Sequence, residues 1–440
     1  MKQKNNAGHR IVIVGGGAGG LELATRLGRS LGKRGRAQVT LVDASLTHIW
    51  KPLLHEVAAG TLDSGEDALD YLSQAQRHHF RFQYGRMIGL DRGNKAIRLA
   101  PFKDAEGRDV VPERNLEYDT LVMAVGSVSN HFNTPGAAEH CLYLDDSAQA
   151  ERFQQLLVKA FLRAQVQETA IDESQLSVAI VGGGATGVEL AAELRNAARK
   201  AVGYGLDRIN PETDLRLTVI EAADRVLPAL SPRLSIKTRK QLDGLGVSVL
   251  TGSKVTEVTD KGMHLESGEF IPADMRVWSA GVKGPAWLSE LDGLETTSGN
   301  MLVANEFLQT TRDENIYAMG DCASVTLPGQ DKPLPPRAQT ASQQATYLNK
   351  SIGQRLRGQQ PSAFTYKDYG SLISLSEDHA VGRLMGGVFG SLMLEGLLAR
   401  AAYNMLYRKH LAAVHGLFRM LILISLRGLF KRTRPRLKLH

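Results

Sequence analysis

Two stretches of the chain combine an apolar run with glycines at the spacing of a phosphate-binding turn. They read "IVIVGGGAGGLEL" (residues 11–23) and "VAIVGGGATGVEL" (residues 178–190). Each contains the pattern G-x-G-x-x-G, formed by Gly15, Gly17 and Gly20 in the first and by Gly182, Gly184 and Gly187 in the second. Glycine permits the positive φ of a sharp turn and lets backbone amides approach a pyrophosphate at the positive end of the following helix. The spacing therefore predicts two dinucleotide-binding turns, which would also include Ala18, Gly19 and Thr186.

An acidic residue follows each turn at the end of a second apolar run. Asp43 ends the run in "VTLVDAS", and Glu221 ends the run in "LTVIEAA". A carboxylate at this strand tip accepts hydrogen bonds from a ribose and repels the 2′-phosphate of NADP. The acids favour two turns that each bind a dinucleotide over two glycine turns that bind nothing. Arg225 keeps NADP as an alternative ligand of the second turn. Glu221 lies further from its glycines than the usual ~20 residues, so we expect residues 199–214 to loop out as an insertion.

These residues need two parallel sheets to position them, because each turn joins a buried strand to a helix. A third apolar stretch, "NIYAMGDCAS" (residues 315–324), ends in Gly320 and Asp321. Together the motifs resemble the glutathione-reductase-like flavoprotein fold, in which such a Gly-Asp pair holds the flavin. Two further stretches are similar to the segments that join the two nucleotide domains of these proteins, "YDTLVMAVGS" with Gly126 and "VWSAGV" with Gly281. The resemblance implies FAD on the first turn and NADH on the second.

The predicted fold is therefore α/β, with two Rossmann-like domains and a C-terminal helical region. The length of 440 residues and the 44 glycines agree with this class. We expect four segments, namely residues 8–145 (first part of the FAD domain), 146–285 (NADH domain), 286–345 (second part of the FAD domain) and 346–440 (membrane association).

Two isolated cysteines, Cys141 and Cys322, are the only cysteines in the sequence. Disulfide reductases of this fold need a redox-active cysteine pair beside the flavin, and sulfide-oxidising relatives need cysteines to carry sulfur. The sequence therefore argues against thiol chemistry, and no cluster of residues predicts a metal site.

The charge of the chain is unevenly distributed. The net charge is +7, yet residues 396–440 contain ten Lys or Arg and no Asp or Glu. A basic end on a mildly acidic body is typical of a surface anchor. The ten cations are Arg400, Arg408, Lys409, Arg419, Arg427, Lys431, Arg432, Arg434, Arg436 and Lys438.

Apolar residues in this tail predict amphipathic helices that lie in the headgroup region of an anionic membrane. Placed on one helix, Leu411, Val414, Phe418 and Leu421 share a face, while Arg408, His415 and Arg419 share another. The stretch "GGVFGSLMLEGLLARAAYNMLY" (residues 386–407) is the second expected helix, and both are too short or too charged to span a bilayer. A dimer interface or domain core is the alternative, and nucleic acid is not an expected partner.

Four motifs in order make the resemblance more specific. "HIWKPLLHEVAAG", "GGGATGVELAAEL", "PPRAQTASQQA" and "YKDYGSL" are similar to segments of the bacterial type II NADH:quinone oxidoreductases, single-subunit NADH dehydrogenases that do not pump ions. The match covers essentially the whole chain. It implies a peripheral enzyme on the cytoplasmic face of the bacterial inner membrane, a homodimer, and ubiquinone or menaquinone as the acceptor.

The resemblance also assigns residues. Ala338, Gln339 and Gln343 would line the quinone site, where neutral amides bind a carbonyl in both oxidation states. Lys367 would stabilise the reduced quinone, Glu189 would lie between nicotinamide and quinone, and Lys51 would approach the flavin. On their own, these residues would fit a surface helix, a solvated lysine and a helix-start carboxylate.

Two other functions remain compatible with the nucleotide motifs. A soluble NADH oxidase or reductase would pass electrons to oxygen or an iron–sulfur protein and would not need the amphipathic tail. An NADH-sensing flavoprotein with a regulatory role would use the same fold without steady turnover.

Overall fold

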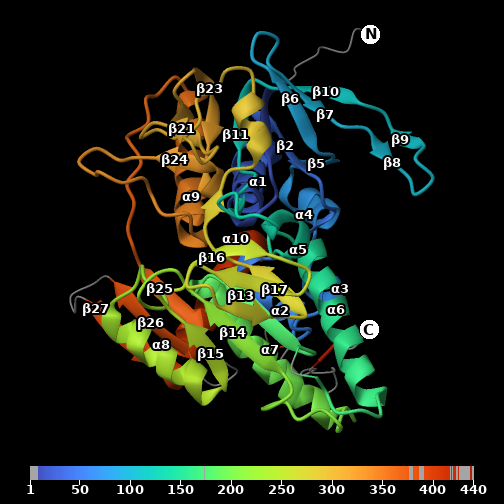
Figure 1. Cartoon of the computed structure of the whole chain (residues 1–440). Coiled ribbons are helices and arrows are strands. Elements are labelled where there is room, and N and C mark those ends of the chain that lie inside the picture. The colour runs from blue at the N-terminus through green and yellow to red at the C-terminus, as the bar shows by residue number, and fades with distance from the viewer. Residues whose placement is uncertain are drawn as a thin grey trace.

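The computed structural model describes residues 8–172, 174–375, 380–385, 391–416, 418, 420–422, 425 and 437–438. Figure 1 shows two lobes, one around each predicted glycine turn, with the C-terminal strands β25–β27 beside the lower lobe. Among the described residues, no helix is both long and apolar enough to cross a bilayer.

The first lobe is built on an eight-stranded sheet in the order β24-β21-β22-β23-β11-β1-β2-β5. Its central strand, β1, runs parallel to both neighbours and reads HRIVIV, because a strand covered on both faces needs apolar residues on both. The strands are β1 (His9–Val14), β2 (Ala37–Asp43), β5 (Arg81–Tyr84), β11 (Thr120–Met123), β21 (Leu302–Ala304), β22 (Gln309–Thr310), β23 (Asp313–Ala318) and β24 (Ala323–Val325). Helix α1 (Ala18–Ser30) packs against α4 (Tyr71–His78) and α9 (Ala338–Arg355).

The second lobe repeats this plan with the parallel sheet β15-β14-β13-β19. Its strands are β13 (Ser177–Val181), β14 (Arg216–Ile220), β15 (Val247–Leu250) and β19 (Met275–Trp278), and its helices are α6 (Ser147–Val166), α7 (Ala185–Gly203) and α8 (Pro232–Gly244). A second, antiparallel sheet contains β16 (Val255–Val258), β17 (Gly262–Leu265) and β18 (Phe270–Pro272). One mixed and one parallel sheet, each with a helix after the glycine turn of its central strand, confirm the predicted α/β class.

The remaining elements are short, and two of them lie where the chain passes between the lobes. β12 (Val128–Ser129) and β20 (Val282–Lys283) pair with each other directly after the stretches predicted to join the domains. The others are β3 (Thr47–His48), β4 (Leu69–Asp70), β6 (Met87–Asp91), β7 (Ala96–Leu99), β8 (Phe102–Lys103), β9 (Asp109–Val111), β10 (Arg114–Glu117), α2 (Leu54–Ala58), α3 (Ser64–Asp67), α5 (Ala137–His140), and the 3-10 turns η1 (Gly32–Arg34), η2 (Lys51–Leu53), η3 (Ala286–Glu290) and η4 (Gly320–Cys322).

Two segment boundaries differ from the sequence-based expectation. The insertion predicted over residues 199–214 begins later, because α7 continues to Gly203 and only the residues after it form the loop. Helix α9 is continuous through residues 345 and 346, so the expected boundary at this point falls inside a helix. Alanine and other good helix formers continue through both positions, and neither Gly nor Pro interrupts them.

The C-terminal region contains β25 (Gly370–Ser374), β26 (Ala380–Met385), β27 (Ser391–Glu395) and α10 (Gly396–His415). The helix predicted over residues 386–407 is therefore wrong in its first part, because residues 391–395 pair with β26 as an antiparallel strand. Helix α10 packs against α1 as well as against this sheet.

The predicted shared face of the last helix is also wrong. Leu411 and Val414 are buried, at 3% and 0% exposure, whereas Phe418 and Leu421 are 77% and 54% exposed. The reason is Gly416, whose φ of +86° ends α10, so that residues beyond it do not continue the same helical face. The predicted polar face of this helix differs too, because His415 is buried whereas Arg408 is exposed. Its third member, Arg419, lies outside the described residues.

Asp119 links the start of β1 to β11 and generates a prediction about stability. Its carboxylate accepts hydrogen bonds from the backbone amide of Arg10 at 2.7 Å and from the guanidinium at 2.9 and 3.2 Å. These bonds lower the pKa of Asp119 from 3.8 to about 2. Because the folded pKa lies below the unfolded one, the stabilisation is complete above pH 4 and disappears as pH falls towards 2.

We therefore expect Asp119→Asn to lower the melting temperature at pH 7 by about 1–2 °C, since a half-exposed pair contributes about 1 kcal/mol. The difference from the unmodified protein should stay constant from pH 7 to about pH 5 and shrink as pH is lowered from about 4 towards 2 in thermal melts. Asp243→Asn, which removes an exposed ion pair with Arg239, is the control and should change little. A pH-independent difference would contradict the assignment.

Candidate functional site

The two predicted glycine turns have nearly the same conformation. Gly15 and Gly182 have φ values of +102° and +105°, which side chains rarely adopt. A Cβ atom on Gly20 would lie 1.8 Å from the carbonyl oxygen of Gly15, and one on Gly187 would lie 2.0 Å from that of Gly182. Glycine is thus required at the first position for the turn and at the third for close approach of helix and strand.

The second glycine of each motif has a different role, because it faces open space. A Cβ atom on Gly17 or Gly184 would meet nothing within 4 Å. These residues are the N-caps of α1 and α7, and no side chain caps either helix. Uncapped amides at an open helix start suit a pyrophosphate, so both turns fit a dinucleotide. Ala18 and Thr186 lie in the first turns of these helices, whereas Gly19 packs against Met319.

A carboxylate closes each turn in the same way. Asp43 accepts a hydrogen bond from the amide of Gly16 at 2.5 Å, and Glu221 accepts one from the amide of Gly183 at 2.7 Å. Each carboxylate also accepts a hydrogen bond from the backbone amide two residues further along the chain, from Ser45 for Asp43 and from Ala223 for Glu221. Burial raises the pKa of Asp43, and these amides oppose the rise. Both carboxylates therefore lie beside the open turns, where a ribose would extend from the pyrophosphate.

Asp321 lies close to the first turn although it is about 300 residues further along the chain, because the strand before it, β23, pairs with β11, which pairs with β1. Its carboxylate is largely buried, which raises its pKa, and it accepts a hydrogen bond from the Ser127 hydroxyl at 3.2 Å. Lys51 donates to the carbonyl of Ser127 at 2.8 Å. Next to Asp321, the amide of Gly320 donates to the side chain of Gln344 at 2.7 Å. Ser127 and Gln344 were not singled out in the sequence, although Ser127 directly follows a predicted strand.

The predicted glycines Gly126 and Gly281 lie where the chain passes between the lobes. Their φ values are +74° and +65°. A Cβ atom on Gly281 would lie 2.5 Å from the ring of Phe132, whereas Gly126 faces open space. Only Gly126 therefore leaves room for a ligand.

The side chains of Gln339 and Gln343 hold a neighbouring segment by its backbone. Gln343 donates to the carbonyl of Lys367 at 2.9 Å and accepts from its amide at 3.1 Å. Gln339 donates to the carbonyl of Gly370 at 3.0 Å and accepts from the amide of Tyr369 at 3.2 Å. Helix α9 thus fixes the backbone of residues 367–370. Within this segment, the Lys367 amino group lies 5.6 Å from the centre of the exposed Tyr369 ring.

An apolar wall adjoins this segment. Trp50, Leu53 and Tyr403 form a buried cluster, against which Ala18, Ala338, Leu372 and Tyr407 pack. Ala18 begins α1 and Ala338 begins α9, so the wall lies beside the first turn as well as beside α10. Trp50 and the tyrosines of α10 were not identified in the sequence as site residues, because their partners are more than 350 residues away.

Glu189 lies at the junction of three chain segments. It belongs to the second turn of α7, is 7% exposed, and accepts a hydrogen bond from the amide of Ser374 in β25 at 2.9 Å. Its other oxygen lies 3.8 Å from Nδ1 of His55 in α2. The predicted first-turn carboxylate is therefore buried between the two lobes and the C-terminal sheet.

Neither cysteine is poised for redox chemistry. Cys141 and Cys322 are buried, and burial raises their pKa values to about 12 and about 11. Both thiols stay protonated at neutral pH, as the sequence analysis expected.

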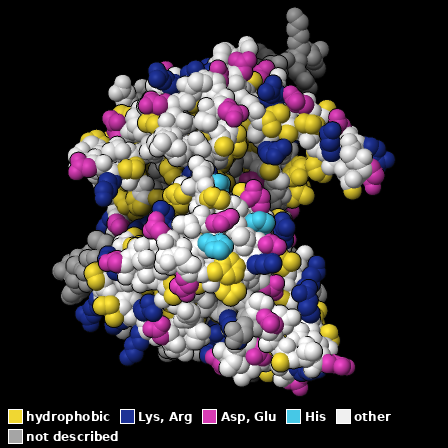
Figure 2. All heavy atoms as spheres, viewed as in Figure 1, with side chains coloured by type: hydrophobic (Ala, Val, Ile, Leu, Met, Phe, Trp, Pro, Cys, Tyr) yellow, Lys and Arg dark blue, Asp and Glu magenta, His cyan; other side chains and the backbone are white. Residues whose placement is uncertain are grey.

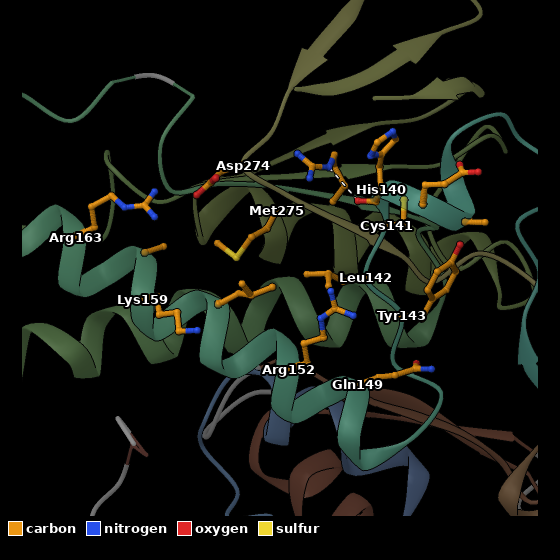
Figure 3. Close-up of a pocket in the computed structure, with 15 residues that line it drawn as sticks. His140, Cys141, Leu142, Tyr143, Gln149, Arg152, Lys159, Arg163, Asp274 and Met275 are labelled. Carbon is orange, nitrogen blue, oxygen red and sulfur yellow. Dashed lines mark hydrogen bonds between the residues drawn. The ribbon is translucent and has the colours of Figure 1, made fainter. Parts of the chain in front are cut away.

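A separate cavity of about 480 Å³ lies on the second lobe, away from both turns (Figure 3). Arg152, Lys159 and Arg163 point towards it from α6, and Cys141 and Asp274 lie on the opposite wall. On the face shown in Figure 2, cationic and anionic side chains are interspersed among the described residues. This cavity contains none of the predicted site residues.

Comparisons with known proteins agree with the geometry. The family model described as "Pyridine nucleotide-disulphide oxidoreductase" matches residues 9–345. The chain is 42% identical to the type II NADH:quinone oxidoreductase of Haemophilus influenzae, over 98% of this chain and 99% of that protein. It is 27% identical to the enzyme of the same name from Staphylococcus aureus, over 86% and 90% of the two chains. The solved structure of NDH2 from Plasmodium falciparum in complex with NADH has a similar fold, with a TM-score of 0.81 at 20% identity, covering 98% and 100% of the chains.

The double hydrogen bond of Gln343 to Lys367 gives a prediction about local order. Gln343→Ala removes both partners, so the Lys367 amide should exchange with solvent about tenfold faster, equivalent to about 1.4 kcal/mol of local protection. Hydrogen–deuterium exchange of peptides covering residues 364–372 measures this. Lys350→Ala, on the exposed side of the same helix, is the control. Equal exchange in both variants would show that α9 does not order the segment.

Proposed function

The chain belongs to the type II NADH:quinone oxidoreductases, and on that premise we propose how its residues divide the reaction. FAD is the cofactor, NADH is the electron donor and a quinone is the acceptor. The overall reaction is NADH + H⁺ + quinone → NAD⁺ + quinol. Bound FAD supplies a carrier that accepts a hydride and releases two electrons.

The first turn holds FAD. The open helix start at Gly17 binds the pyrophosphate, and Asp43 binds the adenosine ribose. Asp321, kept in place by Ser127, and Lys51 bind the part of the cofactor nearer the flavin ring. The Asp321 carboxylate supports this role, because it accepts a hydrogen bond from Ser127 and lies in the field of Lys51 although burial disfavours its charge.

The second turn binds NADH. Gly184 and Thr186 receive the pyrophosphate, and Glu221 binds the adenosine ribose. NADH is preferred to NADPH because Glu221 would repel a 2′-phosphate, and Arg225 is engaged with the carbonyl of Pro228. Gly281 lies at the passage between the lobes, where it approaches the ring of Phe132 and shapes the wall at the nicotinamide end of the site.

The quinone binds at α9. The observation that carries this assignment is the joining of three features at one place: Gln344 contacts Gly320, the neighbouring glutamines hold residues 367–370, and Trp50 and Tyr403 form an apolar wall. Gln339 and Gln343 shape the pocket through the segment they hold, and Lys367 carries the positive charge on its rim. Ubiquinone and menaquinone both fit this chemistry.

The C-terminal region rests on the membrane. Exposed apolar side chains extend from α10 and from the residues after it, namely Met405, Leu406, Phe418, Leu421 and Ile422. Arg408 and Lys409 are exposed on the same helix. We assign this surface to an anionic phospholipid layer at the cytoplasmic face of the inner membrane, where the enzyme acts as a peripheral homodimer that binds no nucleic acid. The predicted cations Arg427, Lys431, Arg432, Arg434 and Arg436 lie outside the described residues, as does the side chain of Arg400.

Separate substitutions should divide the reaction into its two halves. Gly184→Val fills the open helix start of the second turn, so the protein should keep FAD but lose reduction by NADH at least 100-fold. Gln339→Ala should leave anaerobic reduction by NADH intact and slow oxidation of the reduced protein by a short-chain quinone about tenfold. Stopped-flow absorbance of the flavin measures both. If Gln339→Ala slows both halves equally, the quinone assignment is wrong.

Lipid binding tests the proposed surface. Met405→Asp with Leu406→Asp places two charges on α10, and sedimentation with vesicles rich in phosphatidylglycerol should fall several-fold. Leu162→Asp on α6, an equally exposed leucine on the second lobe, is the matched control. Binding of the unmodified protein should weaken in high salt and in neutral vesicles. Unchanged sedimentation of the double variant would place the membrane surface elsewhere.

A further inference from the structure

A buried imidazole lies between two carboxylates beside the proposed quinone site. His55 is 3% exposed. Its Nδ1 atom lies 3.8 Å from the carboxylate of Glu189, and its Nε2 atom lies 4.0 Å from that of Glu56. The two ring nitrogens therefore face two different acids.

The surrounding helices fix this arrangement. Helix α2 comes from the first lobe but packs against α6 and α7 of the second. Leu54, Val57 and Ala58 belong to the same buried cluster as the apolar residues of those helices. The backbone of His55 is therefore held firmly, with its ring directed at Glu189 across the junction between the lobes.

The three side chains differ in their access to solvent. The side chain of Glu56 is 18% exposed, whereas those of His55 and Glu189 are 3% and 8% exposed. They form a path that starts at the water-accessible Glu56 and ends at the buried Glu189. Amides such as Gln339 and Gln343 cannot carry a proton along such a path, because they do not titrate in the physiological range.

The overall reaction needs one proton from solution for each quinol formed. One quinol hydrogen derives from NADH, and the second must reach a quinone oxygen that lies away from bulk water. A histidine can accept a proton on one ring nitrogen and release one from the other, and it does so near neutral pH.

We propose that His55 relays this proton from Glu56 to Glu189, a role that rests on the proposed quinone site. Glu189 lies next to that site because it accepts the amide of Ser374, four residues after Gly370, which Gln339 holds. A proton binds to Nε2, the Nδ1 proton passes to Glu189, and Glu189 gives a proton to the quinone oxygen. The Nε2 proton then returns to Nδ1 through water, which restores the starting tautomer, so no charge accumulates. The two gaps exceed a hydrogen bond, and a shift of about 1 Å or one bridging water closes each of them.

The test compares His55→Gln with the unmodified holoenzyme in both half-reactions. Reduction by NADH should stay within about twofold, because hydride transfer needs no solvent proton. Oxidation of the reduced protein by a short-chain quinone should slow about tenfold or more, and its solvent deuterium isotope effect should increase. Imidazole added to His55→Ala should restore part of the lost rate, which a purely structural role for His55 would not allow.

Two further variants complete the design. His78→Gln removes another buried histidine, one that contacts Arg29 rather than Glu189, and should leave the isotope effect unchanged. In a Glu189→Gln background, His55→Gln should cause little additional loss, because the relay is already interrupted. Equal slowing of both half-reactions without imidazole rescue would overturn the relay, as would a normal quinone rate in His55→Gln. Failure of the unmodified protein to reduce quinone would instead overturn the proposed function.

Discussion

The structure depends on a hydrogen bond made twice, between a strand-end carboxylate and the amide of a glycine in the neighbouring turn. In the first lobe Asp43 accepts from Gly16, and in the second Glu221 accepts from Gly183. The bond fixes the turn on the sheet and leaves the following helix start open. Because each helix is uncapped, its free amides are available to a pyrophosphate. Both proposed nucleotide sites thereby lie at the carboxyl ends of parallel strands, where ligands of such sheets bind.

Residues far apart in the chain complete the first site around this frame. β23 pairs with β11 and brings Asp321 next to Ser127, while η2 brings Lys51 to the same place. Helix α9 then extends the site towards α10 through Ala338 and the two glutamines. Their side chains bind the backbone of residues 367–370, and Gln339 also donates a hydrogen bond to the side chain of Asp368, so α9 fixes the geometry of this segment.

Polar groups at the junction of the lobes divide into two kinds. The amides on α9 are neutral and directional, which suits holding residues 367–370 in place beside the proposed quinone site. Glu189, His55 and Glu56 are titratable and follow one another towards solvent. A protein that moves two electrons and one net proton needs both kinds, and Tyr403 and Tyr407 of α10 complete the apolar wall beside the first turn.

The sequence by itself determined the two turns, their acids, the α/β class and the absence of paired thiols, because these features depend on residue types at short spacing along one strand, turn or helix. It misjudged residues 391–395 and the shared face of Leu411 and Phe418. Apolar composition does not distinguish a paired strand from a helix, and Gly416 ends α10 before Phe418. Only the tertiary structure decided which partners Glu189, Gln339 and Trp50 have. Those contacts join residues separated by up to several hundred positions, and such contacts are fixed by packing between elements rather than by any local pattern.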